Sequence, residues 1–187
     1  MRLTKPRIQP LSDDQLNEDQ REALKDFQPG PILKIFRTLV NAPKALTRFN
    51  AWGGYVLSRR NDLPSREREI VILRIGYLCK SGYEWTQHHR IGLREGLTAE
   101  EIERIKAGAG AGWTPAEAAL IKAADELHAD QFVTDATWAE LKAHFSDKQC
   151  MDVVFTAAQY TQVSMMLNTF GVQLDAGQTL DPDLKGF

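Results

Sequence analysis

One apolar segment near the middle of the chain most constrains its fold. Residues 65–80 have the sequence SREREIVILRIGYLCK, and from Ile70 to Cys79 only Arg74 is charged. A segment that is apolar on nearly every side is expected to be buried on every side. The pattern alone is also compatible with a buried strand. The length of the segment, Ser65 as N-cap and the acidic first turn favour a helix, because the helix dipole stabilises negative charge there.

Helix-start signals recur along the rest of the chain. Three capping boxes, in which a hydroxyl residue precedes a Glu or Gln by three positions, are found at Thr98/Glu101, Thr114/Glu117 and Ser146/Gln149. Upstream, Pro43 separates two further helical segments. We predict an all-α fold in a single domain, residues 1–187, with roughly eight helices. We expect the last helix at about 147–170, and an irregular tail, 172–187, that lies on a neighbouring subunit.

Composition excludes several classes of protein. The formal net charge of −2 leaves no basic excess for phosphate neutralisation, so we expect no nucleic-acid binding. The longest apolar runs are far too short to span a membrane, and the first residues do not resemble a signal peptide. Two cysteines, Cys79 and Cys150, cannot form a disulfide framework. We therefore expect a cytoplasmic protein with reduced thiols.

Residues 79–92, CKSGYEWTQHHRIG, contain the best candidate for a chemical site. Glu84 and His88 are four positions apart, so a helix places them on one face, and the apolar Ile91 continues that face. This phase favours His88 over His89 as the imidazole that faces a pocket. The alternative is a solvated surface pair, which contributes only a few tenths of a kcal/mol.

A second carboxylate, Glu69, lies near the start of the preceding apolar helix. A short turn separates the two helices, so they are expected to pack as an antiparallel hairpin, in which Glu69 can approach His88 without having to touch it. Two carboxylates and an imidazole in apolar surroundings shift one another's pKa values, as acid–base chemistry near neutral pH requires. The same groups form an incomplete metal-ligand set, and no metal is predicted. A lone cysteine such as Cys79 is more often inert packing than a nucleophile.

Two further features leave alternatives open. Arg74 in so apolar a helix either extends to the surface or pairs with a carboxylate, for which Glu84 or Glu69 are the candidates. The last predicted helix carries polar residues, among them Tyr160, within an apolar pattern. Helix–helix hydrogen bonds or a subunit interface are the favoured explanation, with pocket lining as the alternative.

The stretch LPSREREIVILRIGYLCKSGYEWTQHHRIGLREGLTAEEIERIKAG, residues 63–108, resembles the carboxymuconolactone decarboxylase family, which includes the alkylhydroperoxidase-like proteins. The flanking segments resemble it too, so nearly the whole chain is covered. The thiol-peroxidase branch of that family has a glutamate, a Cys-x-x-Cys pair and then a histidine. Glu69 and His88 match the first and last of these, but Ser81 and Glu84 occupy the cysteine positions.

The resemblance implies the decarboxylase type of chemistry, which needs no cofactor, on a small carboxylated lactone or related carbonyl compound. It implies His88 as the acid–base group, Glu84 as the residue that orients or charges it, and Glu69 as the second carboxylate. Substrate-binding residues are then expected among Arg74, Tyr83, Trp85, His89, Cys79 and Tyr160, with Arg74 or His89 holding a substrate carboxylate. A homotrimer or homohexamer is also implied. The alternatives are a thiol-dependent peroxidase that uses Cys79, and a non-catalytic helical oligomer or binding protein.

Overall fold

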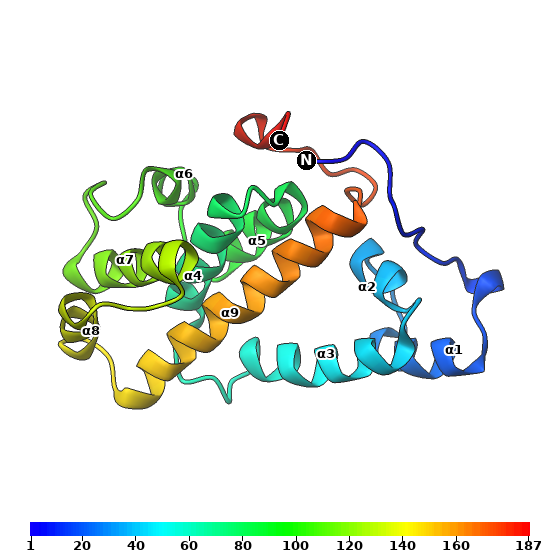
Figure 1. Cartoon of the computed structure of the whole chain (residues 1–187), viewed down its shortest axis with the longest axis horizontal. Coiled ribbons are helices and arrows are strands. Elements are labelled where there is room, and N and C mark those ends of the chain that lie inside the picture. The colour runs from blue at the N-terminus through cyan, green and yellow to red at the C-terminus, as the bar shows by residue number, and fades with distance from the viewer.

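A computed structural model describes all 187 residues, and the chain folds into nine α-helices and three short 3₁₀ helices with no β-strand (Figure 1). The prediction of an all-α, single-domain fold is confirmed. The α-helices are α1 (Glu18–Leu24), α2 (Lys34–Leu39), α3 (Pro43–Val56), α4 (Ser65–Leu78), α5 (Gly82–Arg94), α6 (Ala99–Ala107), α7 (Pro115–Asp130), α8 (Asp135–Lys142) and α9 (Asp147–Phe170). None of these helices has the length and apolar character needed to cross a membrane.

Helix α4 lies at the centre of the molecule. It packs against α5, α6, α7 and α9, and the side chains from Ile70 to Ile75 are all buried. This surrounding explains why the sequence of α4 is apolar on nearly every side. The helix begins at the expected residue, but Pro64, and not Ser65, occupies the N-cap position.

The three capping boxes predicted from the sequence are present. The side chains of Thr98, Thr114 and Ser146 each accept a hydrogen bond from the backbone N–H three residues later. Each such cap is worth about 1 kcal/mol. They fix the starts of α6, α7 and α9, and therefore the frame around α4.

A tight connection joins α4 to α5 as the expected hairpin. Lys80 adopts a left-handed conformation with φ of 54°, and the Ser81 N–H donates to the Gly76 carbonyl at 2.9 Å. Gly76 lies where the two helices approach most closely, since a Cβ at this position would be 3.4 Å from Cγ of Glu84. A glycine here lets α5 place the Glu84 side chain directly against α4.

The first three helices form an arm that is joined to the rest of the fold through two buried side chains, Ile35 of α2 and Val56 of α3. In Figure 1 they lie on one side of α9, and α6, α7 and α8 lie on the other. The arm has its own small buried cluster, made of Leu16, Leu24, Val40 and Leu46, and α3 contacts α9. The arm therefore stands opposite α5 across one end of α9.

The C-terminal tail folds back over its own chain, and contact of this tail with a neighbouring subunit stays a prediction. Asp175 accepts hydrogen bonds from the Tyr83 hydroxyl at 2.6 Å and from Gln87 Nε2 at 2.7 Å. Further along, the side chain of Leu184 is buried. These contacts give the irregular segment partners within the chain that its sequence pattern did not reveal.

Candidate active site

His88 lies between two buried carboxylates. Its Nδ1 is 2.7 Å from Oε2 of Glu69, and its Nε2 is 3.1 Å from Oε1 of Glu84. All three residues are buried, with exposed fractions of 1% for Glu69, 3% for Glu84 and 6% for His88. The hairpin of α4 and α5 therefore brings together the three residues that the sequence placed near one another. Glu69 makes direct contact with His88, which is closer than the sequence required.

The two contacts of His88 differ in kind. The Nδ1 contact is a hydrogen bond, in which the protonated imidazole donates to Glu69. The Nε2 contact is close, but its geometry is not that of a hydrogen bond, and Oε1 of Glu84 has no hydrogen-bond partner. A buried carboxylate oxygen without a partner is energetically costly. Glu84 is therefore the member of the group that is open to a ligand or a proton.

The surroundings raise the pKa values of both Glu84 and His88. Burial raises the pKa of Glu84 to about 7, and Glu69 adds to that rise while His88 opposes it. Burial by itself would lower the pKa of His88, but the carboxylates of Glu69 and Glu84 outweigh burial and raise that pKa above its usual value. The group thus combines an imidazole whose protonated form is favoured by its carboxylate neighbours with a carboxyl that gains or loses its proton easily near pH 7.

Helix α9 covers the group with an aromatic ring. Tyr160 packs edge-on against the His88 imidazole, with ring centroids 4.8 Å apart. Burial, followed by the nearby carboxylates of Glu84 and Glu69, raises the pKa of the Tyr160 hydroxyl well above its usual value. The phenol therefore stays protonated and can donate a hydrogen bond at neutral pH.

A cavity of about 430 Å³ opens onto Glu84 and His88. Its far wall comes from the helical arm and carries aromatic and aliphatic side chains, including Phe27, Phe36 and Phe49. No lysine or arginine lines it. The complete lining is Asp26, Phe27, Leu33, Ile35, Phe36, Phe49, Asn50, Gly53, Gly54, Leu57, Tyr83, Glu84, Gln87, His88, Ile91, Gln159, Tyr160 and Val163. An apolar cavity with a few converging polar groups is the usual form of a small-molecule site.

The model of the carboxymuconolactone decarboxylase family matches residues 43–126, which run from the first residue of α3 to a point within α7. These residues include the α4–α5 hairpin and with it Glu69, Glu84 and His88. Over these residues the chain is similar to the carboxymuconolactone decarboxylase family. No curated protein shows significant sequence similarity to it.

Several solved structures share the fold of this chain. An uncharacterized peroxidase-related protein from Ralstonia eutropha JMP134, with an alkylhydroperoxidase AhpD core, matches with a TM-score of 0.80 at 20% identity, covering 91% of this chain and 93% of that chain. A protein of unknown function from Agrobacterium tumefaciens, proposed to be the antioxidant defence protein AhpD, has a TM-score of 0.68 at 20% identity, with 74% and 95% covered. The debrominase Bmp8, as a cysteine-to-alanine variant in complex with 2,3,4-tribromopyrrole, has a TM-score of 0.72 at 13% identity, with 92% and 94% covered. At these identities the likeness concerns the fold alone.

Four of the residues expected to serve the site line the cavity, namely Glu84, His88, Tyr83 and Tyr160. Glu69 lies behind His88 and reaches the cavity only through the imidazole. Tyr83 is held at the rim by its hydrogen bond to Asp175 of the tail. These placements are geometric, and a chemical role for each residue is a matter for the proposal below.

The other four expected substrate-binding residues lie outside the cavity. Arg74 pairs with Asp125, at 2.5 Å, and donates to the carbonyls of Ile105 and Lys106, at 2.9 Å each. Its partner is thus neither Glu84 nor Glu69, the two carboxylates that the sequence offered. Asp125 lies 51 positions away in the chain, so no local sequence pattern indicated this pair.

The remaining three residues point away from the cavity for different reasons. Trp85 is buried in the core and donates from Nε1 to Asp181, at 3.1 Å. His89 lines a shallow pocket on the other side of α5 with residues of the tail, as the helical phase predicted when it favoured His88. Cys79 lines a different pocket, at the far end of α4.

Sequence reasoning missed three polar residues near the site. Gln87 and Gln159 line the cavity, and Oε1 of Gln159 is buried without a partner. Arg68 is buried near His88, with an unpartnered Nε and two long contacts of 3.5 Å to backbone carbonyls. The polar pattern of the last helix was a signal for Gln159, but pocket lining was the less favoured explanation. Among the described residues, no group of three or more His, Cys, Asp or Glu side chains is arranged to hold a metal ion.

Proposed function

We propose that the protein is an acid–base enzyme that needs no cofactor and transfers protons on a small, largely apolar carbonyl compound, in a reaction of the decarboxylase or lyase type. One observation carries this proposal. His88 is held between two buried carboxylates at one side of an apolar cavity, and the pKa of the partner that faces the cavity, Glu84, is about 7. A group whose pKa lies near the working pH is the most effective acid–base catalyst.

Each residue has a distinct part in the proposed chemistry. In a decarboxylation the bond between the carboxylate carbon and the ring breaks, carbon dioxide leaves, and the bonding electrons move into a conjugated carbonyl. The resulting enolate is then protonated on carbon, and His88 or Glu84 supplies that proton. Glu69 positions the imidazole and stabilises its charge. Tyr160 lines the cavity, and its protonated hydroxyl can donate to the developing oxyanion.

The lining of the cavity narrows the class of substrate. A substrate carboxylate was expected to pair with Arg74 or His89, and neither reaches the cavity. A carboxylated lactone would have to place its carboxylate against the protonated His88, close to Glu69 and Glu84. An uncharged cyclic carbonyl compound fits the aromatic wall better, but it has no carboxylate to lose, so its reaction would be a lyase- or isomerase-type proton transfer and not a decarboxylation. The debrominase of the same fold binds a halogenated aromatic ring, 2,3,4-tribromopyrrole, which supports an apolar ring as ligand.

The two alternative functions have weaker support. A peroxidase that cycles through a disulfide needs an attacking and a resolving thiol. Cys79 lies outside the cavity, and the other cysteine, Cys150, is fully buried in the core. A non-catalytic helical protein would gain little from a buried cluster of ionisable side chains, because burying charged groups rarely adds stability. Clusters of this kind are typical of functional sites.

The test compares two neighbouring histidines. His88→Asn and His89→Asn are assayed with a panel of uncharged cyclic ketones, lactones and carboxylated lactones in deuterated water. Proton exchange is followed by NMR, and released carbon dioxide is measured in parallel. We expect His88→Asn to lower the rate by about 10²–10⁴-fold and His89→Asn to leave it unchanged. Full turnover in His88→Asn would overturn the assignment, and exchange without carbon dioxide would identify an isomerase-type reaction instead.

A further inference from the structure

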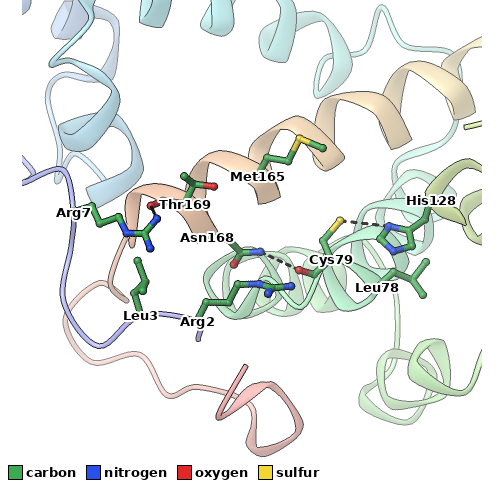
Figure 2. Close-up of a pocket in the computed structure, with 9 residues that line it drawn as sticks. All are labelled: Arg2, Leu3, Arg7, Leu78, Cys79, His128, Met165, Asn168 and Thr169. Atoms are coloured by element: carbon green, nitrogen blue, oxygen red, sulfur yellow. Dashed lines mark hydrogen bonds between the residues drawn. The ribbon is translucent and has the colours of Figure 1, made fainter.

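A second pocket lies at the far end of α4, apart from the cavity described above. Its volume is about 460 Å³, and it shares no lining residue with the active-site cavity. The N-terminal segment, the end of α4, α7 and α9 all contribute to it (Figure 2). The lining residues are Arg2, Leu3, Arg7, Leu78, Cys79, His128, Met165, Asn168 and Thr169.

A thiol and an imidazole meet on one side of this pocket. Sγ of Cys79 is 3.6 Å from Nδ1 of His128, and Figure 2 shows the two side chains pointing toward one another. Asn168 holds the backbone here by donating to the Cys79 carbonyl at 2.9 Å. Burial raises the pKa of the Cys79 thiol, an effect that Ser164 and Arg2 partly offset. The thiol is therefore protonated at neutral pH, and the His128 imidazole is its nearest proton acceptor.

Two arginines without ion-pair partners, Arg2 and Arg7, line the same pocket. No aspartate or glutamate lines it, and neither Arg2 nor Arg7 forms an ion pair. Arg7 makes a single long hydrogen bond, of 3.4 Å, to the Thr169 carbonyl. Figure 2 shows Arg2 extending from the N-terminal segment toward Cys79. Two guanidinium groups without partners are suited to a carboxylate, which they bind in a planar, two-pronged geometry.

We propose that this pocket binds a small organic carboxylate through Arg2 and Arg7 and holds its carbon chain against the Cys79 thiol, with His128 as the proton acceptor of that thiol. The apolar side chains of Leu3, Leu78 and Met165 provide contacts for a short hydrocarbon part. This carboxylate-binding pocket shares no lining residue with the cavity of the acid–base group, although the charge of Glu84 contributes to raising the pKa of the Cys79 thiol.

Two alkylating reagents of the same shape test the proposal. Iodoacetate carries a carboxylate, and iodoacetamide has an uncharged amide in its place. With either reagent the Cys79 sulfur attacks the CH₂ carbon, a C–S bond forms, iodide leaves with the electrons of the C–I bond, and the thiol proton passes to His128. The ratio of the two rates, measured on the Cys79 peptide by mass spectrometry, reports how strongly the pocket favours an anion. Cys150 is fully buried, so it should stay unmodified.

The expected results separate charge from general reactivity. In Arg2→Ala/Arg7→Ala the ratio of iodoacetate to iodoacetamide rates should fall about tenfold, because local positive charge concentrates anions by at least that factor. In Arg48→Ala/Arg59→Ala, which removes two positive charges outside the pocket, the ratio should not change. In His128→Asn both reagents should slow by a similar factor. An unchanged ratio in Arg2→Ala/Arg7→Ala would overturn the proposal.

A competition on the unaltered protein gives an independent test. Butyrate should slow the iodoacetamide reaction of Cys79, whereas butyramide, which has the same shape without the charge, should not. Inorganic phosphate serves as a third competitor, and protection by phosphate alone would show that the site takes phosphate and not a carboxylate. Equal protection by butyrate and butyramide, or none by either, would also refute the carboxylate site. Loss of the activity proposed for His88 would leave all these results unaffected.

Discussion

Replacing Glu84 by glutamine should change how the stability of the protein depends on pH. Glutamine has the shape of glutamate but no charge, so the variant keeps the packing against Gly76 and removes only the ionisation. The pKa of Glu84 rises from 4.5 to about 7 on folding. Since one pKa unit corresponds to about 1.4 kcal/mol, the ionised Glu84 should cost the folded state about 3 kcal/mol above pH 7.

The direction of the effect follows from which state binds the proton more tightly. The folded state holds the Glu84 proton up to about pH 7, and the unfolded state releases it near pH 4.5. The unfolding free energy of the natural protein should therefore fall as pH rises between these values, and then stay level. The raised pKa of His88 acts in the same direction, because the stability it confers is lost as the pH rises through its folded value. Glu84→Gln weakens both contributions.

Urea unfolding followed by circular dichroism measures this dependence. The unfolding free energy of Glu84→Gln relative to the natural protein should rise by about 3 kcal/mol between about pH 4.5 and about pH 8. Glu95→Gln is a matched control, because Glu95 is exposed at the end of α5 and should leave the pH profile unchanged. If the natural protein and Glu84→Gln lose stability in parallel as pH rises, burial does not raise the pKa of Glu84, and the acid–base argument loses its basis.

Two further substitutions distinguish a residue that lines the cavity from a residue that stabilises the fold. Gly54 lines the cavity, and a Cβ there would meet no atom within 4 Å, so Gly54→Leu should block ligand entry while stabilising α3 by up to about 1 kcal/mol. Thermal unfolding and the proton-exchange assay check this, with the exposed Ala51→Leu as control, and full activity in Gly54→Leu would place the substrate elsewhere. Arg74→Met removes the ion pair with Asp125 and two hydrogen bonds to the end of α6, so it should lower the unfolding free energy by about 3 kcal/mol. Its KM should not change, and a raised KM in a stably folded Arg74→Met would return Arg74 to substrate binding.

The sequence predicted those features that depend on near neighbours in the chain. The helical character of residues 65–78, the caps at Thr98, Thr114 and Ser146, and the common face of Glu84 and His88 all follow from spacings of one or two turns. The choice of His88 over His89 rested on the same periodicity.

Features that depend on distant segments could not be predicted in the same way. Asp125 as the partner of Arg74, and Asp181 as the acceptor for Trp85, are contacts across 51 and 96 positions. The aromatic wall of the cavity comes from the arm, whose position relative to α5 depends on how α3 packs against α9. No short sequence pattern encodes such packing, which is why four of the residues expected to bind a substrate lie outside the cavity.

The small buried cluster of the arm has an evolutionary consequence. The group proposed to transfer protons lies on α4 and α5, whereas much of the cavity wall belongs to the arm, which has its own cluster of buried side chains. Substitutions in the arm that spare Ile35 and Val56, which the arm buries together with the rest of the fold, can therefore reshape the cavity at little risk to the core. A scaffold divided in this way can exchange its ligand preference while its reactive centre stays intact. Such a division is compatible with members of one fold, at 13–20% identity to this chain, being as different as peroxidase-related proteins and a debrominase.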